Sequence, residues 1–205
     1  QRIFILNNSI FENFCGVQIS GTNNTIALNE MIGYNNLDYD RILETTDGIY
    51  LKGLNNSVIS NKIIGNDYGI HSSSAEKYSI AGSKNLIIDN LFINKVNFDS
   101  ENAYNNNFNS TELIPSTNII GGSFIGGNYW ALSNATGFSQ TVPDDDNNGI
   151  CDEPYTIDEN NCDSFPLASG ITTTLLTLTV PETAYCQKNF VLSGRLTNQD
   201  GFGIA

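Results

Sequence analysis

Apolar and polar residues alternate in short runs through residues 1–95, which is the period of a β-strand. The spacing of three and four residues that marks an amphipathic helix does not occur in this stretch. The runs also repeat, because an asparagine followed two residues later by a large apolar residue recurs in the same local context. These anchor asparagines are Asn8, Asn29, Asn61 and Asn90.

The residues around the anchors fall into columns. The first two anchors are 21 residues apart, and the wider spacings that follow are this period plus insertions, the largest being "LDYDRILETTD". The column two positions after the anchors contains Ile10, Met31, Ile63 and Phe92. The column three positions before them contains Ile5, Ile26, Val58 and Ile87. A glycine followed by alternating apolar residues recurs at Gly16, Gly48 and Gly69.

A unit this short cannot bury its apolar residues alone, so the repeat predicts a solenoid whose strands stack about 4.8 Å apart. The two apolar columns would fill the interior. The anchor asparagines would bond to one another as an amide ladder at a turn, and the glycines would permit the corners. An unfolded asparagine-rich segment would not keep such columns, and the leucine pattern of a leucine-rich repeat is missing.

Three segments carry a family resemblance. "NAYNNNFNSTELIPSTNIIGGSFIGGNYW" (residues 102–130) looks like a closing coil, and "DDDNNGICDEPYTI" and "DSFPL" look like a calcium-type loop and a terminal hairpin. With these segments the chain resembles right-handed parallel β-helix proteins of the NosD-like family, found as surface proteins of methanogenic archaea. The resemblance covers residues 1–168 and implies an all-β, right-handed parallel β-helix with coils of about 21 residues.

The acidic loop is the sharpest chemical signal. Its residues match positions 1, 3, 5, 7 and 9 of an EF-hand loop, with Gly149 at the sharp bend. The expected calcium ligands are Asp144, Asp146, Asn148, the Ile150 carbonyl and Asp152. Tyr155 stands where an EF-hand has its bidentate glutamate, so Asp158, Glu159 or Asp163 would have to complete the shell. The alternative is a solvated acidic turn.

The four cysteines show neither CxxC spacing nor a nearby histidine, which favours an oxidising compartment over zinc binding. Cys151 and Cys162 bracket the acidic loop and are expected to form a disulfide. Cys15 and Cys186 remain, and they could pair within one chain or between two chains.

The residue pattern changes after Pro166, because threonine now alternates with leucine or valine. We therefore expect a β-helix over residues 1–168, which includes the closing coil and the calcium-type loop (141–167). Residues 169–205 resemble the first strands of an immunoglobulin-like module, which needs about 100 residues to be complete. Such a fragment would be completed by a neighbouring subunit or by more of a longer parent chain. The opening "QRIFILNNSIF" also looks like the interior of a strand, with no signal peptide.

The net charge of the chain limits the classes of partner that it can bind. The chain has 22 acidic and 9 basic residues, a net charge of −13, so nucleic acid is a poor partner. No apolar run is long enough to span a membrane. Thirty asparagines give a surface of amides, which is typical of extracellular solenoids and glycoproteins. Sequons for N-glycosylation stand at Asn7, Asn23, Asn55, Asn109 and Asn134.

These observations predict a non-catalytic, extracellular structural protein: a building block of a surface layer, sheath, filament or adhesin. It would assemble as a homo-oligomer or filament through strand edges, with a glycan as a possible partner. The alternatives are a glycan-binding module or a carbohydrate-active enzyme, for which the insertion supplies Asp38, Asp40, Arg41, Glu44 and Asp47. A copper site is disfavoured, because His71 is the only histidine and Met31 the only methionine.

Overall fold

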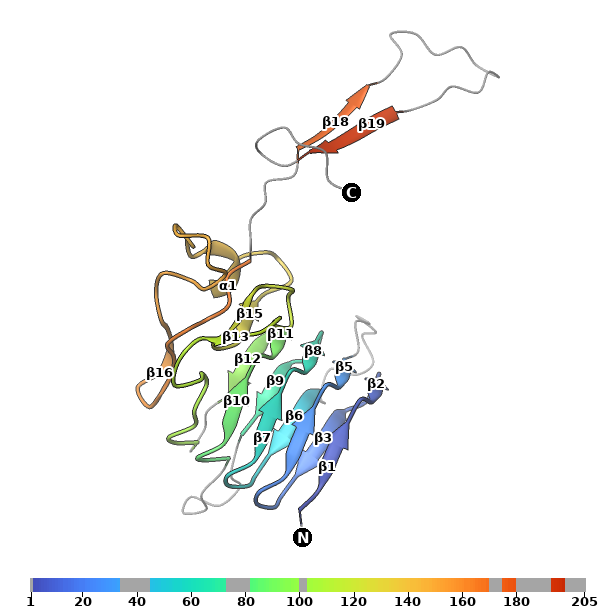
Figure 1. The fold of residues 1–205 in the computed structure, drawn as a ribbon. Coiled ribbons are helices and arrows are strands. Elements are labelled where there is room, and N and C mark those ends of the chain that lie inside the picture. The colour runs from blue at the N-terminus through green and yellow to red at the C-terminus, as the bar shows by residue number, and fades with distance from the viewer. Residues whose placement is uncertain are drawn as a thin grey trace, which may run out of the picture. The chain divides into compact units, whose positions relative to one another are not determined.

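The computed structural model describes residues 2–33, 45–72, 82–99 and 103–169, together with the backbone of two strands at 175–179 and 193–197. The chain divides into two compact units, Gln1–Ser169 and Gly170–Ala205. Nearly all regular structure in the described residues is β-strand, and the one helix among them is the four-residue α1 (Phe138–Thr141). The first unit is a parallel β-helix (Figure 1).

Three parallel sheets form the walls of the β-helix, and each full coil adds one strand to each sheet. Sheet A contains β1 (Phe4–Leu6), β4 (Thr25–Ala27), β7 (Ser57–Ile59) and β10 (Leu86–Ile88). Sheet B contains β2 (Ser9–Phe11), β5 (Glu30–Ile32), β8 (Lys62–Ile64), β11 (Leu91–Ile93) and β15 (Tyr129–Ala131). Sheet C contains β3 (Cys15–Ile19), β6 (Asp47–Leu51), β9 (Tyr68–His71) and β12 (Val96–Asp99).

The strand registers confirm both predicted apolar columns. In sheet A the register aligns Ile5, Ile26, Val58 and Ile87. In sheet B it aligns Ile10, Met31, Ile63 and Phe92, and adds Trp130 as a further member. From the second coil onward these side chains are at most 1% exposed. The interior is therefore a stack of equivalent side chains, which is why one repeat cannot fold without its neighbours.

The corners follow a common rule, in which a residue in the left-handed backbone region precedes a buried asparagine. Between sheets A and B the left-handed residues have φ from 53° to 59°; they are Asn7, Leu28, Ser60 and Asp89. The asparagines that follow form the predicted ladder, which runs through Asn8, Asn29, Asn61, Asn90 and Asn128. Two further ladders exist: one joins Asn24, Asn56, Asn85 and Asn106, and the other joins Asn66, Asn94 and Asn97.

The repeated glycines have a different place from the one expected. Gly16, Gly48 and Gly69 lie inside β3, β6 and β9 rather than at corners. A Cβ atom on Gly16 would lie 2.6 Å from the Gly48 carbonyl oxygen, and one on Gly48 would lie 2.7 Å from that of Gly69. The glycines are therefore required by close approach of the backbones in sheet C.

The stack ends in a cap of short elements after β12. These are the hairpin β13 (Ile114–Pro115) and β14 (Phe124–Ile125), then α1, and the hairpin β16 (Tyr155–Asp158) and β17 (Asn161–Asp163). Aromatic rings close the interior, because Trp130 lies 4.9 Å from Phe92, 5.9 Å from Phe108 and 5.1 Å from Tyr155 between ring centroids. The cap thus shields the end of the apolar columns from water.

In the second unit the described strands are β18 (Leu175–Thr179) and β19 (Ser193–Thr197), which pair antiparallel. The immunoglobulin-like module remains a prediction, since one strand pair does not distinguish it from other antiparallel folds. Among the described residues no helix has both the length and the apolarity that a membrane crossing requires.

Candidate functional site

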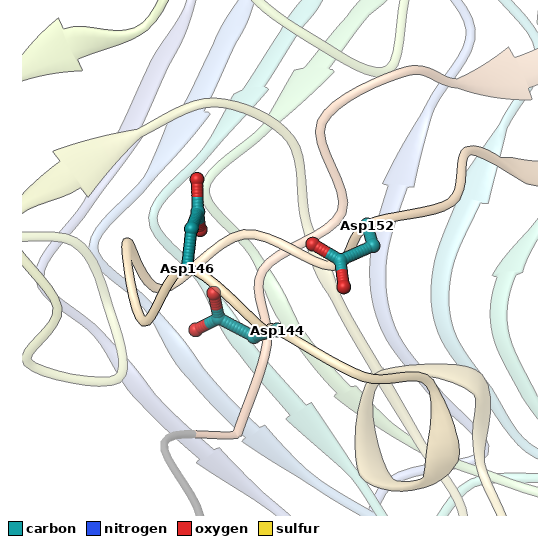
Figure 2. Close-up of side chains that lie close together, drawn as sticks. All are labelled: Asp144, Asp146 and Asp152. Carbon is teal, nitrogen blue, oxygen red and sulfur yellow. The ribbon is translucent and has the colours of Figure 1, made fainter.

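The acidic loop joins α1 to β16, and it brings three carboxylates together. Oxygen atoms of Asp144, Asp146 and Asp152 all lie within 4.8 Å of one another (Figure 2). Calcium binds oxygen at about 2.3–2.6 Å, so two oxygens on one ion can lie up to about 5 Å apart. The three aspartates therefore fit a calcium ion, and the exposure of Asp146 and Asp152 leaves the site accessible from solvent.

Backbone donors fix the shape of this loop. Asp144 accepts hydrogen bonds from the backbone N–H of Asn148 (3.0 Å) and of Gly149 (2.8 Å). Gly149 has φ of +85°, a conformation that L-residues rarely adopt, with no atom within 4 Å of an added Cβ. The predicted sharp bend at Gly149 thus depends on glycine for its backbone angle. Asp152 closes the loop by accepting from Asp145 N–H at 3.0 Å.

The other predicted ligands are placed differently. The Asn148 side-chain oxygen accepts a hydrogen bond from Ile150 N–H at 2.8 Å, and Ile150 itself is 6% exposed. No carboxylate of Asp158, Glu159 or Asp163 belongs to the cluster among the described residues. The Asp158 carboxylate instead accepts from Asn160 N–H and the Asn161 amide within the β16–β17 turn. The structure therefore supplies three of the five expected ligands as converging carboxylates.

Asp163 lies in the cap rather than in the loop. Its Oδ2 accepts from the backbone N–H of Asn128 (2.7 Å) and from Trp130 Nε1 (2.8 Å), and its Oδ1 accepts from Phe165 N–H (3.1 Å). Burial raises the pKa of Asp163 to about 6, although these donors act in the opposite direction. Gly127 leaves the space for the carboxylate, which a Cβ there would contact directly.

The expected disulfide between Cys151 and Cys162 is wrong for this structure, in which both thiols are free. In β17 Asn161 and Asp163 point inward, so strand alternation turns Cys162 outward. Cys151 is 5% exposed, and burial raises its pKa to about 12. Cys15 is half-buried in β3, where burial also raises its thiol pKa, and Cys186 lies outside the described residues.

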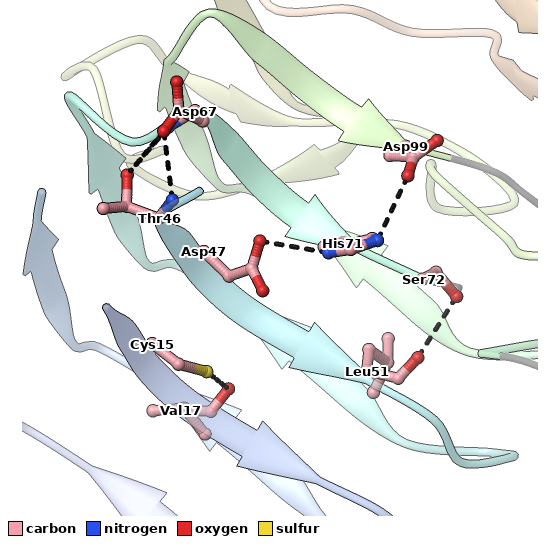
Figure 3. A network of polar contacts seen from close by, with 9 residues as sticks. All are labelled: Cys15, Val17, Thr46, Asp47, Leu51, Asp67, His71, Ser72 and Asp99. Carbon is pink, nitrogen blue, oxygen red and sulfur yellow. Dashed lines mark hydrogen bonds and ion pairs between the residues drawn. The ribbon is translucent and has the colours of Figure 1, made fainter. Parts of the chain in front are cut away.

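A second polar cluster lies on the outer surface of sheet C. His71 Nδ1 lies 3.1 Å from an Asp47 oxygen, and His71 Nε2 lies 3.4 Å from an Asp99 oxygen (Figure 3). The rings of Tyr68 and Tyr50 flank the imidazole at 4.8 and 5.0 Å. Desolvation raises the pKa of Asp47, and His71 partly offsets that rise. The sequence alone did not group these residues, because their register across three coils was needed to do so.

The expected catalytic cleft in the insertion is only partly described. Asp38, Asp40, Arg41 and Glu44 lie outside the described residues. Asp47 lies at the start of β6, where His71 engages its carboxylate. The sequons differ in their surroundings: Asn7, Asn23, Asn55 and Asn134 are exposed, whereas Asn109 is half-buried and accepts from Ser164 N–H.

Comparison with known proteins decides the family. The family model described as "Periplasmic copper-binding protein (NosD)" matches residues 1–137. The chain belongs to the NosD family. No curated protein and no solved structure matches the chain. Membership of the NosD family agrees, at a coarse level, with the expected location outside the cytoplasm.

Copper, which the NosD family description names, does not fit the residues present. Soft or imidazole ligands hold copper in proteins. Met31 is 1% exposed inside the sheet B column, and both ring nitrogens of His71 face carboxylates. Among the described residues, the only group of three or more metal-ligating side chains is the aspartate cluster of the loop. Its hard oxygen donors suit calcium better than copper.

Proposed function

We propose that this NosD-family chain is a non-catalytic structural protein of the cell exterior. It would serve as a building block of a surface layer, sheath, filament or adhesin. The observation that carries the proposal is the continuous ladder from Asn8 to Asn128, closed by Asp163. Each rung is tied to the next by hydrogen bonds, and the rungs from Asn29 onward are buried, so the stack is suited to bear load rather than to open and close.

Calcium would lock the cap onto the last coil. The acidic loop is already tied to this coil, since Cys151 N–H donates to Pro166 O and Leu167 N–H donates to Asn128 O. Three converging carboxylates repel one another when no cation lies between them. A bound calcium ion removes that repulsion and adds stability to the folded state alone.

The calcium proposal is tested by the melting temperature of the full chain. We expect calcium at 100 times its dissociation constant to stabilise the protein by about 2.7 kcal/mol relative to excess chelator. Asp146→Asn and Asp152→Asn should each remove most of this effect. Asp145→Asn is the matched control, because Asp145 is exposed in the same loop but lies outside the carboxylate cluster. Identical melting curves with and without chelator, with metal removal verified, would refute a calcium role.

Assembly would use the strand edges of the first coil. In the described residues β1, β2 and β3 each pair with another strand on one side only. Phe4, Phe11 and Phe14 are 57%, 50% and 47% exposed in the same coil. Strand edges with exposed apolar neighbours favour pairing with a further strand, which a second copy of the chain or more of a longer parent chain would supply. A bond between Cys15 and Cys186 could make the contact covalent, or could instead lie within one chain.

Sedimentation velocity and non-reducing electrophoresis test the assembly. We expect concentration-dependent oligomers, which Phe4→Lys weakens by placing a charge beside the β1 edge. Tyr104→Lys is the control, because Tyr104 is 46% exposed but belongs to a distant coil. A ladder of covalent multimers supports the interchain disulfide, whereas a monomeric band with linked Cys15 and Cys186 peptides rejects it. A monomer at all concentrations contradicts the assembly itself.

A further inference from the structure

A groove of about 560 Å³ runs along the outside of the corner between sheets A and B. Its floor is made by outward residues of sheet B, where the register places Ser9, Glu30 and Lys62 in successive coils. One wall contains the left-handed corner residues, Leu28 and Ser60 among them. A second wall is the segment from Thr117 to Ile119, which belongs to the β13–β14 hairpin.

A buried carboxylate holds this second wall in place. Asp89, which is 3% exposed, accepts hydrogen bonds from Ser60 Oγ (2.6 Å) and from Ile119 N–H (2.8 Å). The hairpin is therefore anchored to the corner rather than merely resting against it. The groove is thus a built feature whose walls are set before anything binds.

Leu28 is the unusual residue of the groove. It adopts φ of 59° and is 58% exposed, although L-residues with branched apolar side chains avoid this backbone region. The equivalent positions in neighbouring coils contain Asn7 and Ser60, and asparagine suits the left-handed region best after glycine. A strained, exposed leucine in a polar groove contributes nothing to the core. Such a residue points to contact with a ligand.

The remaining lining is polar, and its charged side chains are Glu30, Lys62 and the buried Asp89. Among the described residues neither the Glu30 carboxylate nor the Lys62 ammonium has a hydrogen bond or ion pair. Apart from the Asp89 carboxylate, which is already hydrogen-bonded, the groove therefore offers one anion, one cation and several hydroxyl groups around an aliphatic platform. A ligand with many hydroxyl groups and apolar C–H faces satisfies all of them, whereas a polyanion would meet the net charge of −13.

We propose that this groove binds a neutral oligosaccharide laid along the stack of coils. Leu28 packs against the C–H face of a sugar ring, and Glu30 and Lys62 hydrogen-bond to its hydroxyl groups. The outward positions of sheet B lie about 4.8 Å apart in successive coils, so an oligosaccharide that spans Ser9, Glu30 and Lys62 gains contacts that one sugar cannot. The site is independent of the calcium loop, whereas its residues Asn7, Asn8 and Ser9 lie in the first coil, beside the strand edges proposed for assembly.

Calorimetric titration of the unglycosylated full chain tests the proposal, because a glycan on Asn7 would compete for the groove. The probes are cellohexaose, chitohexaose and mannohexaose, with glucose as the single-sugar comparison. We expect at least one neutral hexasaccharide to bind and glucose to bind too weakly to measure. Leu28→Asn should weaken hexasaccharide binding at least about tenfold while leaving the melting temperature unchanged or higher.

Lys84→Asn is the matched control, since Lys84 has φ of 56° at another corner, preceding the ladder residue Asn85. This variant should bind as the wild type does. Glu30→Gln with Lys62→Gln should also weaken binding, because the charged hydrogen bonds to hydroxyl groups are lost. Absence of binding to all three hexasaccharides overturns the proposal. So does unchanged affinity in Leu28→Asn, or tighter binding of hexagalacturonate than of every neutral probe.

Discussion

Asp163 accepts hydrogen bonds from both the backbone N–H and the side-chain amide of Asn128, at 2.7 and 3.4 Å. A carboxylate therefore stands at the end of a ladder whose other members are asparagines. A middle rung must accept from one neighbour and donate to the next. The last rung faces only donors, those of Asn128, Trp130 and Phe165, so an aspartate satisfies them all.

The stability of the protein should depend on the protonation of Asp163. Its folded-state pKa of about 6 exceeds the ordinary value of 3.8, so the folded chain holds this proton more tightly. The resulting stabilisation is fully present below about pH 4 and is lost as the pH rises through about 6. We expect Asp163→Asn to flatten the dependence of the urea-unfolding free energy on pH over this range, by up to about 3 kcal/mol.

Asp145→Asn provides the control for this pH measurement, because it makes the same chemical change at an exposed aspartate. An unaltered slope in Asp163→Asn would show that another group titrates in this range. Asp47 and Asp89, whose pKa values are also raised by burial, are then the groups to replace.

A middle rung should be far less tolerant of replacement. Asn61 donates to Asn90 Oδ1 and to the carbonyl groups of Ile26 and Ile59, and it accepts from the backbone and side chain of Asn29. Asn61→Ala leaves several buried groups unpaired, so we expect a loss of at least about 4 kcal/mol in the free energy of unfolding.

Asn13→Ala is the comparison for this rung, since Asn13 is exposed and makes one hydrogen bond, to the Phe11 carbonyl. It should cost less than about 1 kcal/mol. If Asn13→Ala and Asn61→Ala lost similar amounts of unfolding free energy in urea denaturation, burial of the ladder would contribute little to stability.

A third prediction concerns the apolar column of sheet B. Ile63 is fully buried between Met31 and Phe92, so Ile63→Ala should lower the free energy of unfolding by about 2–5 kcal/mol. Its neighbour Ile64 is only half-buried, on the other face of β8. Ile64→Ala should therefore lower the free energy of unfolding by about 1 kcal/mol or less. Equal losses measured by thermal unfolding would contradict the inward assignment of Ile63.

The columns were predictable because stacked strands allow one register, so equivalent residues must share a chemical type. A second ladder was equally visible in principle, because Asn24, Asn56 and Asn85 each stand five residues before an anchor asparagine. The column of Gly16, Gly48 and Gly69 was expected at corners but lies inside strands, because a sequence shows that glycine is needed without showing the reason. In sheet C the reason is a facing carbonyl oxygen, which only the stacking of coils reveals.

The candidate site, like the fold, could be predicted from the sequence only in part. The proximity of Asp144, Asp146 and Asp152 was predictable from local spacing alone, because a tight loop decides where their side chains point. The pairing of Cys151 with Cys162 failed because separation along the chain does not show which face of a strand a residue occupies. The role of Asp163 depends on Asn128, 35 residues away, so no local sequence pattern indicates that role.

All the rungs from Asn8 to Asn128 point the same way, with each N–H donating toward the following coil. Their amide dipoles therefore add, much as peptide dipoles add along a helix. The positive end of this row meets the carboxylate of Asp163 at the capped end of the stack. The solenoid thus has an electrical polarity along its axis, with the negative side of the row toward Asn8 and the positive side toward Asp163.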